Sequence, residues 1–367
     1  MTRALVIGGG ISGMSVAFHL AAALAPGSVH LLEAEPELAW HTTSRSAAML
    51  TSNFGPDPVR SLTRASVELL APWLSPRGLL TVAGETELGA SFEYESQLLA
   101  EAAEFDVLAY EDVRAICGIL RPEASVRAIY ERGAADIDVM GLFDFYARGL
   151  RDRAGMTTRS VRVSHIAHHY SGWQITAGAN TFDADIIVNA AGAWGDDVAR
   201  LAGVPPVGLE PRRRTALLAE VSAVDPDELN SWPLVAAIND EWYFKPDSGA
   251  LLISPVDATP DPPQDARPDD LDVALALERV NDATTLGLRR VRTAWAGLRT
   301  FAPDGIPVFG PDPAVPDFVW AVGQGGYGIQ SAPANGALVA ALTLGAALPD
   351  WLAGIDPADT APERLRH

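Results

Sequence analysis

Residues 4–13 read ALVIGGGISG, a short apolar run that leads directly into a glycine turn. The run predicts a buried strand, and residues 11–24 after the glycines have the composition of a helix. Residues 29–33 are apolar again and predict a second strand. Strand, glycine turn, helix and strand in this order predict one βαβ unit.

The glycine turn carries the spacing Gly-x-Gly-x-x-Gly through Gly8, Gly10 and Gly13. The first glycine permits a tight turn, the second lets the backbone approach a pyrophosphate, and the third lets the helix pack on the strand. The N-terminus of the helix then faces the phosphates with its partial positive charge. Glu33 ends the second strand, where a carboxylate accepts hydrogen bonds from ribose hydroxyls. The pattern predicts a dinucleotide cofactor, either NAD or FAD.

Two further segments favour FAD. Residues 40–49, WHTTSRSAAM, are small and rich in hydroxyls, which suits packing along a pyrophosphate and an isoalloxazine ring. The alternative is a plain Ser/Thr helix cap. Residues 323–330, GQGGYGIQ, form a glycine-rich loop before a long Ala/Leu helix. Such a loop allows the backbone to approach a flat ring, and a helix N-terminus stabilises negative charge on a reduced flavin.

The composition excludes several classes of protein. A net charge of −20 opposes sequence-independent binding of nucleic acid, which needs a basic face. No stretch supplies the roughly 20 apolar residues of a membrane helix. The single cysteine, Cys117, allows no intramolecular disulfide. The run of small residues at 21–25 could pass for part of a signal peptide, but the glycines before it favour the βαβ unit. We expect a cytoplasmic enzyme with a small-molecule substrate and an unknown electron acceptor.

The chain is long enough for two cores. A second strand-to-glycine turn ends the predicted strand 182–189, and a third follows the predicted strand 318–322. Antiparallel strands are predicted between these signals, so two interleaved domains are expected. The predicted fold is α/β, with a Rossmann-type FAD-binding domain (1–74, 140–206 and 290–367) interleaved with an α+β substrate domain on an antiparallel sheet (75–139 and 207–289).

Five segments in order carry a resemblance to a known family: GGGISG at 8–13, SRSAA at 44–48, NAAGAW at 189–194, WAGLR at 295–299 and GGYGIQ at 325–330. Together they resemble the D-amino-acid oxidase superfamily of FAD-dependent amine oxidoreductases, and within it the bacterial D-arginine-type dehydrogenases. The resemblance implies that a D-amino acid is oxidised by hydride transfer from Cα to the flavin. Water then converts the imino acid to a keto acid and ammonia. A glycine/sarcosine-type or secondary-amine oxidase, or a flavin subunit of a multi-component dehydrogenase, remains the alternative.

The resemblance also implies a substrate site. Arg214 and Arg299 correspond to the two arginines that hold the substrate carboxylate, a task that suits planar guanidinium forks. Arg214 lies in a run of three arginines, of which at least one is expected to be a solvated surface charge. Tyr243 corresponds to a tyrosine that hydrogen-bonds substrate, and its alternative is a core aromatic residue. Gly326 and Tyr327 would present backbone groups to the amine.

Three positions depart from the D-arginine-type pattern. Leu79, Phe54 and Met49 stand where those enzymes carry a glutamate, a tyrosine and a histidine. A buried cation without a carboxylate partner is costly, so we expect a neutral or apolar substrate side chain. Glu85 or Glu87 from the following loop is the alternative counter-ion.

One cysteine and several histidines bear on how the cofactor is attached and on metal binding. His41 lies where related dimethylglycine-type dehydrogenases attach FAD covalently, but D-arginine-type enzymes have a histidine there without the bond, so non-covalent FAD is favoured. Cys117 is expected to be a buried small residue. His165, His168 and His169 are interpreted as surface residues without a metal, and no catalytic base is assigned. The residues predicted to contact FAD are Gly8, Gly10, Ser12, Gly13, Glu33, Ala34, His41, Thr42, Thr43, Ser44, Arg45, Ser46, Ala47, Ala48, Met49, Val163, Ala191, Gly192, Gly325, Gly326, Tyr327, Gly328, Ile329 and Gln330.

Overall fold

A six-stranded sheet made from the beginning, middle and end of the chain forms the first layer of a computed structural model, which describes residues 2–170, 172–222 and 224–366. Its strand order is β19-β20-β13-β1-β2-β9, and all neighbours are parallel except β19 and β20. Strands β1 and β20 are apolar and buried along their whole length because both faces of the sheet are covered there. The bounds are β1 (Ala4–Ile7), β2 (Val29–Leu32), β9 (Met156–Thr158), β13 (Ile186–Asn189), β19 (Val308–Pro311) and β20 (Phe318–Val322).

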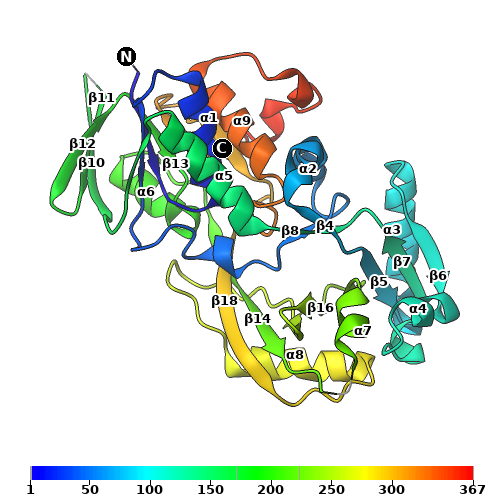
Figure 1. Ribbon diagram of the computed structural model, residues 1–367. Coiled ribbons are helices and arrows are strands. Elements are labelled where there is room, and N and C mark those ends of the chain that lie inside the picture. Colours follow the sequence, from blue (N-terminus) through cyan, green and yellow to red (C-terminus); the bar gives the residue numbers. More distant parts are fainter. Residues whose placement is uncertain (1, 171, 223, 367) are drawn as a thin grey trace.

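Helices cover one face of this sheet, and a three-stranded antiparallel sheet packs on the other (Figure 1). Val6 and its neighbours on one face pack against α1 (Ile11–Ala23), α5 (Val139–Asp152) and α9 (Ala332–Leu344). Leu5 and Ile7 on the other face pack against the small sheet and α6. The elements on that side are β10 (Val163–His169), β11 (Gly172–Ala177), β12 (Asn180–Ala184) and α6 (Gly195–Leu201).

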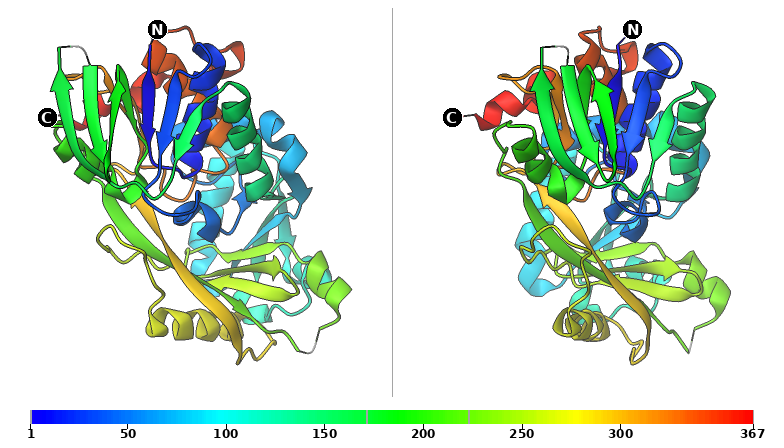
Figure 2. Two further views of the ribbon diagram at one scale, coloured as in Figure 1. Left: turned by 60° about the vertical axis from the view of Figure 1, so that its left-hand side comes forward. Right: turned by 90° about the vertical axis from the view of Figure 1, so that its left-hand side faces the viewer.

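An eight-stranded sheet forms the second layer, and its long strands β14 and β18 reach up to the first (Figure 2). Its order is β18-β14-β17-β16-β15-β5-β7-β6, antiparallel throughout except for the pair β15 and β5. Cys117 is buried in its core, as predicted. The bounds are β5 (Leu79–Ala83), β6 (Asp106–Ala109), β7 (Arg127–Glu131), β14 (Glu210–Ala219), β15 (Leu234–Ala237), β16 (Tyr243–Asp247), β17 (Ala250–Ser254) and β18 (Val291–Phe301), with helices α4 (Tyr110–Ile116), α7 (Pro226–Ser231) and α8 (Asp270–Ala283).

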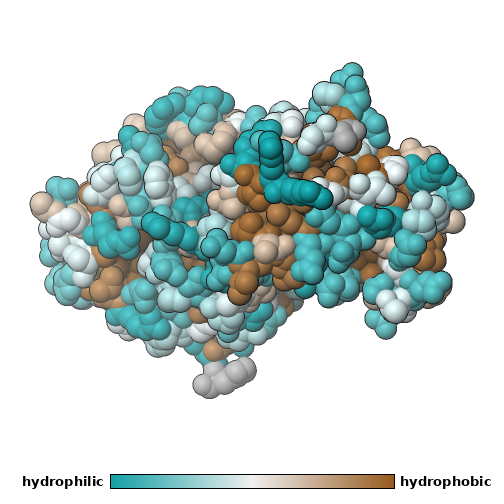
Figure 3. All heavy atoms as spheres, turned by 90° about the horizontal axis from the view of Figure 1, so that it is seen from below, coloured by the Kyte–Doolittle hydropathy of each residue, from teal (hydrophilic) through white to brown (hydrophobic). Residues whose placement is uncertain are grey.

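A three-stranded sheet in the order β3-β8-β4 joins the two layers. Its strands are β3 (Met49–Leu50), β4 (Leu74–Pro76) and β8 (Ala135–Ile137), and α2 (Asp57–Leu70) lies beside it. Helix α3 (Leu88–Ala100) packs on β5 and β7 of the eight-stranded sheet. The face seen from below mixes hydrophilic residues with smaller hydrophobic areas (Figure 3). In the parts of the chain that the structure describes, none of the helices combines the length and apolar character that crossing a membrane requires.

The predicted α/β fold with interleaved segments is confirmed, but three details are corrected. The strand at 291–301, placed with the FAD-binding segments by a boundary at 290, is β18 and pairs with β14 in the second sheet. The predicted strand 182–189 is two strands, β12 and β13, which belong to different sheets. The sequence pattern around 93–105 predicts a helix, and the helix found there, α3, begins earlier, at Leu88, and ends at Ala100.

Candidate active site

A cavity of about 350 Å³ lies at the carboxyl end of β1, between the six-stranded sheet and the upper ends of β14 and β18. Its lining combines residues that follow β1, β2 and β13 with residues of β14, β16 and β18. Open parallel sheets bind ligands outside the carboxyl ends of their strands, at the point where the strand order reverses. Here β1 is that point, since the chain runs from β1 to β2 on one side and β13 pairs on the other.

The glycine turn forms the floor of this cavity. A Cβ atom on Gly13 would lie 2.0 Å from the carbonyl oxygen of Gly8, so this crossing of helix and strand requires glycine. Gly10 is the N-cap of α1 and provides no side-chain cap. The first amide of the helix, on Ile11, donates to Thr43 Oγ1 at 3.0 Å. The open helix N-terminus therefore presents backbone N–H groups and a partial positive charge to the cavity.

Glu33 is held rigidly beside the turn. Its Oε2 accepts a hydrogen bond from the Gly9 amide at 2.6 Å, and its Oε1 accepts one from the Glu35 amide at 2.7 Å. Each carboxylate oxygen has a second lone pair, so the group retains acceptor capacity toward the cavity that it lines. This is the geometry expected of a carboxylate that receives ribose hydroxyls.

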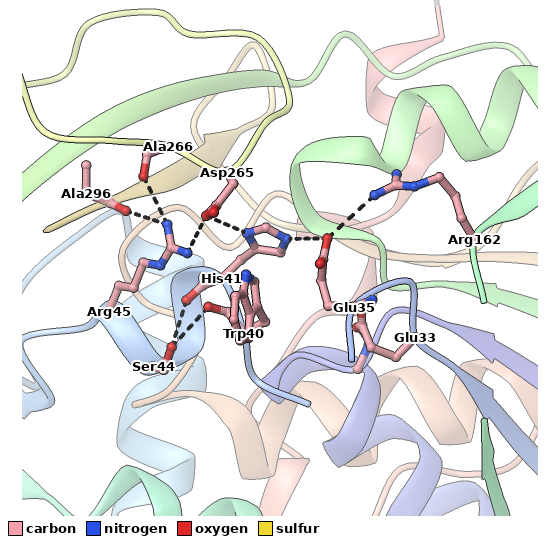
Figure 4. A network of polar contacts seen from close by, with 11 residues as sticks. Glu33, Glu35, Trp40, His41, Ser44, Arg45, Arg162, Asp265, Ala266 and Ala296 are labelled. Atoms are coloured by element: carbon pink, nitrogen blue, oxygen red, sulfur yellow. Dashed lines mark hydrogen bonds and ion pairs between the residues drawn. The ribbon is translucent and has the colours of Figure 1, made fainter. Parts of the chain in front are cut away.

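The segment after β2 crosses the cavity as a short 3-10 helix, Thr42–Arg45, and attaches to the second layer. Thr42 Oγ1 donates to the Leu298 carbonyl at 2.8 Å, and Trp295 Nε1 donates to the Arg45 carbonyl at 3.1 Å. Figure 4 shows the Arg45 guanidinium pointing back toward the carbonyls of Ala266 and Ala296. Small and hydroxyl side chains therefore suit this segment because it packs tightly between two sheets.

His41 lies between two carboxylates at the edge of the cavity. Its Nε2 is 3.2 Å from Glu35 Oε1 and its Nδ1 is 3.8 Å from Asp265 Oδ1 (Figure 4). Its ring centroid is 4.8 Å from that of Trp194, and Arg162 lies 5.9 Å above the Trp194 ring. Sequence reasoning placed His41 at the cavity but missed its partners, which come from distant segments.

The C-terminal glycine loop closes the other side. Gln324 Nε2 donates to Ser12 Oγ at 2.7 Å, which ties this loop to α1. A Cβ atom on Gly326 would lie 3.0 Å from the guanidinium carbon of Arg299, so glycine makes room for that arginine. Gln330 faces away from the cavity and bonds to Thr51 and Thr63.

Two arginines face the cavity from neighbouring strands. Arg214 lies on β14 opposite Gly297, and Arg299 lies on β18 opposite Arg212. Arg214 Nε donates to the Asp257 carbonyl at 2.6 Å. Burial, and secondarily the charge of Arg299, lower the pKa of Arg214 to about 10. Among the described residues, no carboxylate oxygen lies within 4.0 Å of either guanidinium.

The other two arginines of the run have different environments. Arg212 is exposed and pairs with Glu210. Arg213 is mostly buried and donates to Asp272 at 3.0 Å. The expectation that one member of the run is a surface charge is therefore confirmed for Arg212, while Arg213 belongs to an internal ion pair.

An apolar cluster lies beside the arginines. Leu79 packs with Ala134 and Leu234, and Met49 and Tyr243 pack against this group. Only Tyr243 of these five lines the cavity itself. Leu79 and Met49 therefore lie behind the wall rather than in it.

Two aromatic rings lie at the outer side of the same region. Phe54 is 41% exposed, and its ring centroid is 5.7 Å from that of Tyr327. Burial is the main cause that raises the pKa of Tyr327. The backbone of the glycine loop, rather than the Tyr327 side chain, reaches the cavity.

Two acids near this region were missed by sequence reasoning, which considered Glu85 and Glu87. Glu131 lies opposite Leu79 on β7, is 4% exposed, and accepts hydrogen bonds from Asn53 Nδ2 at 2.5 Å and Tyr94 Oη at 2.6 Å. Burial raises the pKa of Asp240, while Arg214 and Arg299 act to lower it. Glu131 is therefore already partnered by neutral donors, and Asp240 senses the two arginines.

The cavity assembles most of the predicted residues: Gly8, Gly10, Ser12, Glu33, Ala34, His41, Thr42, Thr43, Arg45, Ser46, Ala47, Val163, Ala191, Gly192, Arg214, Tyr243, Arg299, Gly325, Gly326, Gly328 and Ile329. It leaves out Gly13, Ser44, Ala48, Met49, Phe54, Leu79, Tyr327 and Gln330. The Ser44 hydroxyl does not face the cavity, because it donates to the carbonyl oxygens of Trp40 and His41 in its own turn. The cavity adds Glu35, Arg162, Trp194, Gln264, Ala266 and Gln324 to the predicted residues.

The residues fit a dinucleotide such as FAD. The N-terminus of α1, where Gly10 brings no side chain, suits a pyrophosphate, Glu33 suits a ribose, and the glycine loop permits close approach of a flat ring. Within residues 2–170, 172–222 and 224–366 no group of three or more His, Cys, Asp or Glu side chains is arranged to hold a metal. His168, one of the three histidines considered, pairs with Asp317 and stacks on Trp173.

Comparison with known proteins gives matches along nearly the whole chain. The family model described as FAD dependent oxidoreductase matches residues 3–342. FAD-dependent oxidoreductase domain-containing protein 1 of Bos taurus is 25% identical over 93% of this chain and 80% of that protein. Mitochondrial dimethylglycine dehydrogenase of Rattus norvegicus is 25% identical over 96% of this chain, which spans only 43% of that protein. The crystal structure of glycine oxidase from Geobacillus kaustophilus shares the fold, with a TM-score of 0.83 and 23% identity over 97% of this chain and 98% of that chain.

Proposed function

Because the chain belongs to the family of FAD-dependent oxidoreductases, with FAD as its cofactor, we propose that it oxidises the Cα–N bond of an α-amino acid. The proposed substrate is a D-amino acid with a neutral or apolar side chain. The proposed product of the oxidation is an imino acid, which water converts to a keto acid and ammonia.

The observation that carries this proposal is the pair of arginines, Arg214 and Arg299, which have no carboxylate oxygen within 4.0 Å among the residues that the structure describes. Burying two cations side by side costs free energy, as the lowered pKa of Arg214 shows. A structural role would be expected to place a carboxylate next to them, since unpaired buried charges are disfavoured. An anionic ligand supplies the missing partner, and a planar carboxylate matches the guanidinium fork. The arginines therefore favour a substrate that carries a carboxylate.

The chain's own residues act by binding and orientation. Arg214 and Arg299 would hold the carboxylate, and Tyr243 lines the cavity beside them with a hydroxyl that is able to donate to the same group. FAD, when bound, accepts the hydride that leaves Cα. The substrate ammonium first loses a proton to water, so the proposal requires no side-chain base. Fixing the carboxylate orients Cα, and such positioning accounts for a large share of the barrier reduction in bimolecular reactions.

The apolar cluster supports the proposed side chain. Leu79 and Met49 pack behind Tyr243, the residue of this cluster that lines the cavity, so apolar side chains back the wall at that point. Both oxygens of the nearby Glu131 already accept hydrogen bonds from Asn53 and Tyr94. Freeing that carboxylate for a substrate cation would break two buried hydrogen bonds, which is unfavourable. A basic side chain is therefore expected to bind poorly.

The D configuration rests on the five ordered sequence motifs alone, and N-substituted substrates are a second candidate because a dimethylglycine dehydrogenase is among the relatives. Anaerobic bleaching of the flavin absorbance distinguishes them. The panel comprises D- and L-leucine, D-arginine, glycine, sarcosine, dimethylglycine and isobutylamine. We expect fast bleaching by D-leucine and none by isobutylamine, which lacks the carboxylate. Faster bleaching by L-leucine than by D-leucine would contradict the D configuration. Faster bleaching by dimethylglycine would contradict a primary amine as substrate, and faster bleaching by isobutylamine would contradict the binding of a carboxylate by the arginines.

A further inference from the structure

The segment from 255 to 269 crosses from the eight-stranded sheet to the cofactor cavity. It leaves β17, runs along the edge of β14, and ends at α8. Near its middle it is anchored to β14 by the Arg213 amide, which donates to the Thr259 carbonyl at 2.8 Å, and by the Asp261 amide, which donates to the Pro211 carbonyl at 3.0 Å. Prolines at 260, 262, 263 and 268 restrict its backbone. We refer to residues 262–268 as the strap.

The strap reaches over the cavity and touches the segment that lies across it. Gln264 and Ala266 line the cavity, while Asp265 between them does not. The Asp265 carboxylate instead points to Arg45 and His41 (Figure 4). The Arg45 side chain also donates to the Ala266 carbonyl at 3.1 Å. The strap is thus fastened to the FAD-binding segment through the Asp265 carboxylate, which is its only charged contact there among the described residues, and through the Ala266 carbonyl.

The two side chains of the Arg45–Asp265 ion pair differ in their exposure to solvent. The Arg45 side chain is 16% exposed and lines the cavity, whereas the Asp265 side chain is 56% exposed on its outer side. The hydrogen bond from Arg45 is the main cause that lowers the pKa of Asp265. The carboxylate is therefore ionised at neutral pH and able to hold the guanidinium in place. Without it, Arg45 would keep its carbonyl contacts but lose its only charged partner among the described residues.

We propose that Asp265 is a cofactor-retaining residue: it fastens the strap over the FAD cavity and slows the release of FAD. Because Asp265 does not line the cavity, its effect on FAD must pass through the position of Arg45 and the strap. The proposal rests on FAD as cofactor and not on the identity of the substrate. Failure of the proposed substrate in the bleaching assay therefore leaves it untouched.

The expected effect is moderate. An exposed ion pair contributes little, but one whose cation is mostly buried and hydrogen-bonded contributes more. We expect Asp265→Asn to release FAD about three- to tenfold faster than the wild type. Since the carboxylate is exposed, salt should screen the pair. Release from the wild type should therefore accelerate as NaCl is raised to about 1 M, and release from Asp265→Asn should change less.

The experiment uses the holoenzyme and follows the rise of FAD fluorescence after dilution. Asp265→Glu, which keeps the carboxylate, should restore slow release. Asp270→Asn is the matched control, because it removes the same charge two residues beyond the strap, at the start of α8. Thermal unfolding of the apoprotein should be alike for the wild type and Asp265→Asn. The proposal would be overturned if Asp265→Asn released FAD at the wild-type rate, or if Asp270→Asn released it as fast as Asp265→Asn. It would also be overturned if Asp265→Asn destabilised the apoprotein as much as the holoenzyme. The salt dependence of the wild type tests it even if the variant fails to fold.

Discussion

Removing either cavity arginine should weaken catalysis without removing the cofactor. In Arg214→Ala or Arg299→Ala, the substrate carboxylate loses one guanidinium fork, while the glycine turn, Glu33 and the strap keep their contacts. A charge-assisted hydrogen-bonded contact of this kind contributes about 1.5–3 kcal/mol, which corresponds to roughly ten- to 150-fold in kcat/KM. We expect most of the loss in KM, because the carboxylate is bound in both the ground state and the transition state.

The structure refines this estimate in two ways. The charges of Arg214 and Arg299 repel each other, as the lowered pKa of Arg214 indicates, so removing one relieves the other. The two single losses should then not add in the double variant. Arg299→Lys keeps the charge but not the planar fork, and should lie between wild type and Arg299→Ala.

The assay is steady-state turnover of the best substrate from the bleaching panel, with bound FAD measured from its absorbance. Arg212→Ala is the matched control, since Arg212 lies on the same strand but is exposed and pairs with Glu210. It should behave as wild type. Unchanged kinetics in Arg214→Ala or Arg299→Ala, or an equal loss in Arg212→Ala, would refute the assignment of the carboxylate clamp.

Four further predictions follow from the same site. Gly326→Ala should raise KM while FAD stays bound, because the added Cβ would lie 3.0 Å from the Arg299 guanidinium carbon; an unchanged KM would show that the arginine has room to move. D-Leucine should exceed D-arginine in kcat/KM at one pH, since a buried cation without a free counter-ion is costly, and the reverse order would indicate that Glu131 or Asp240 serves as one. Arg214→Leu should raise the free energy of unfolding at pH 7 in urea titrations. The pKa of Arg214 in the folded protein, about 10, lies below the ordinary 12.5, so the unfolded state binds more protons between these two values. The destabilisation that Arg214 causes is therefore fully present below pH 10 and fades as the pH rises from 10 to 12.5. Acid or heat denaturation should release FAD into the supernatant, whereas flavin that stays with the precipitate would point to a covalent bond, with His41 as the first residue to test.

The predictions from sequence succeeded where the signal was local. The glycine spacing at 8–13 fixes a strand, a turn and a helix within one short stretch, and the buried run at 318–322 has the same character. The apolar runs at 4–7, 79–83, 250–254 and 318–322 each predict a strand, and β1, β5, β17 and β20 have these bounds. The short edge strand β9, at Met156–Thr158, was missed because three residues carry too little pattern.

Residues of the site that the sequence did not predict were missed for a different reason. Glu131 reaches the cavity region through the pairing of β7 with β5, and Asp257 and Asp265 reach it through the segment that follows β17. Their neighbours along the chain give no sign of either placement. Leu79 was predicted to be an apolar residue of the substrate pocket. Its position behind the cavity wall could not be predicted, because it depends on packing with Leu234 and Ala134, which are distant in sequence. Residue type alone therefore does not determine which side chains form the wall of the pocket.

The charge distribution adds an argument about substrate class. The chain carries a net charge of −20, yet two cations of its cavity, Arg214 and Arg299, have no carboxylate oxygen within 4.0 Å in the described parts of the chain. A surface of this sign repels anions over distances of about a Debye length, roughly 10 Å at 0.1 M salt, while the arginines attract a carboxylate only once it is inside. A zwitterionic amino acid with a neutral side chain has no net charge and crosses that field freely, whereas a dicarboxylic amino acid is repelled. KM for a neutral amino acid should therefore change little with salt, and KM for D-aspartate should be higher and fall as salt is added. A KM for D-aspartate that rises with salt would show that the arginines, and not the acidic surface, control the approach of substrate.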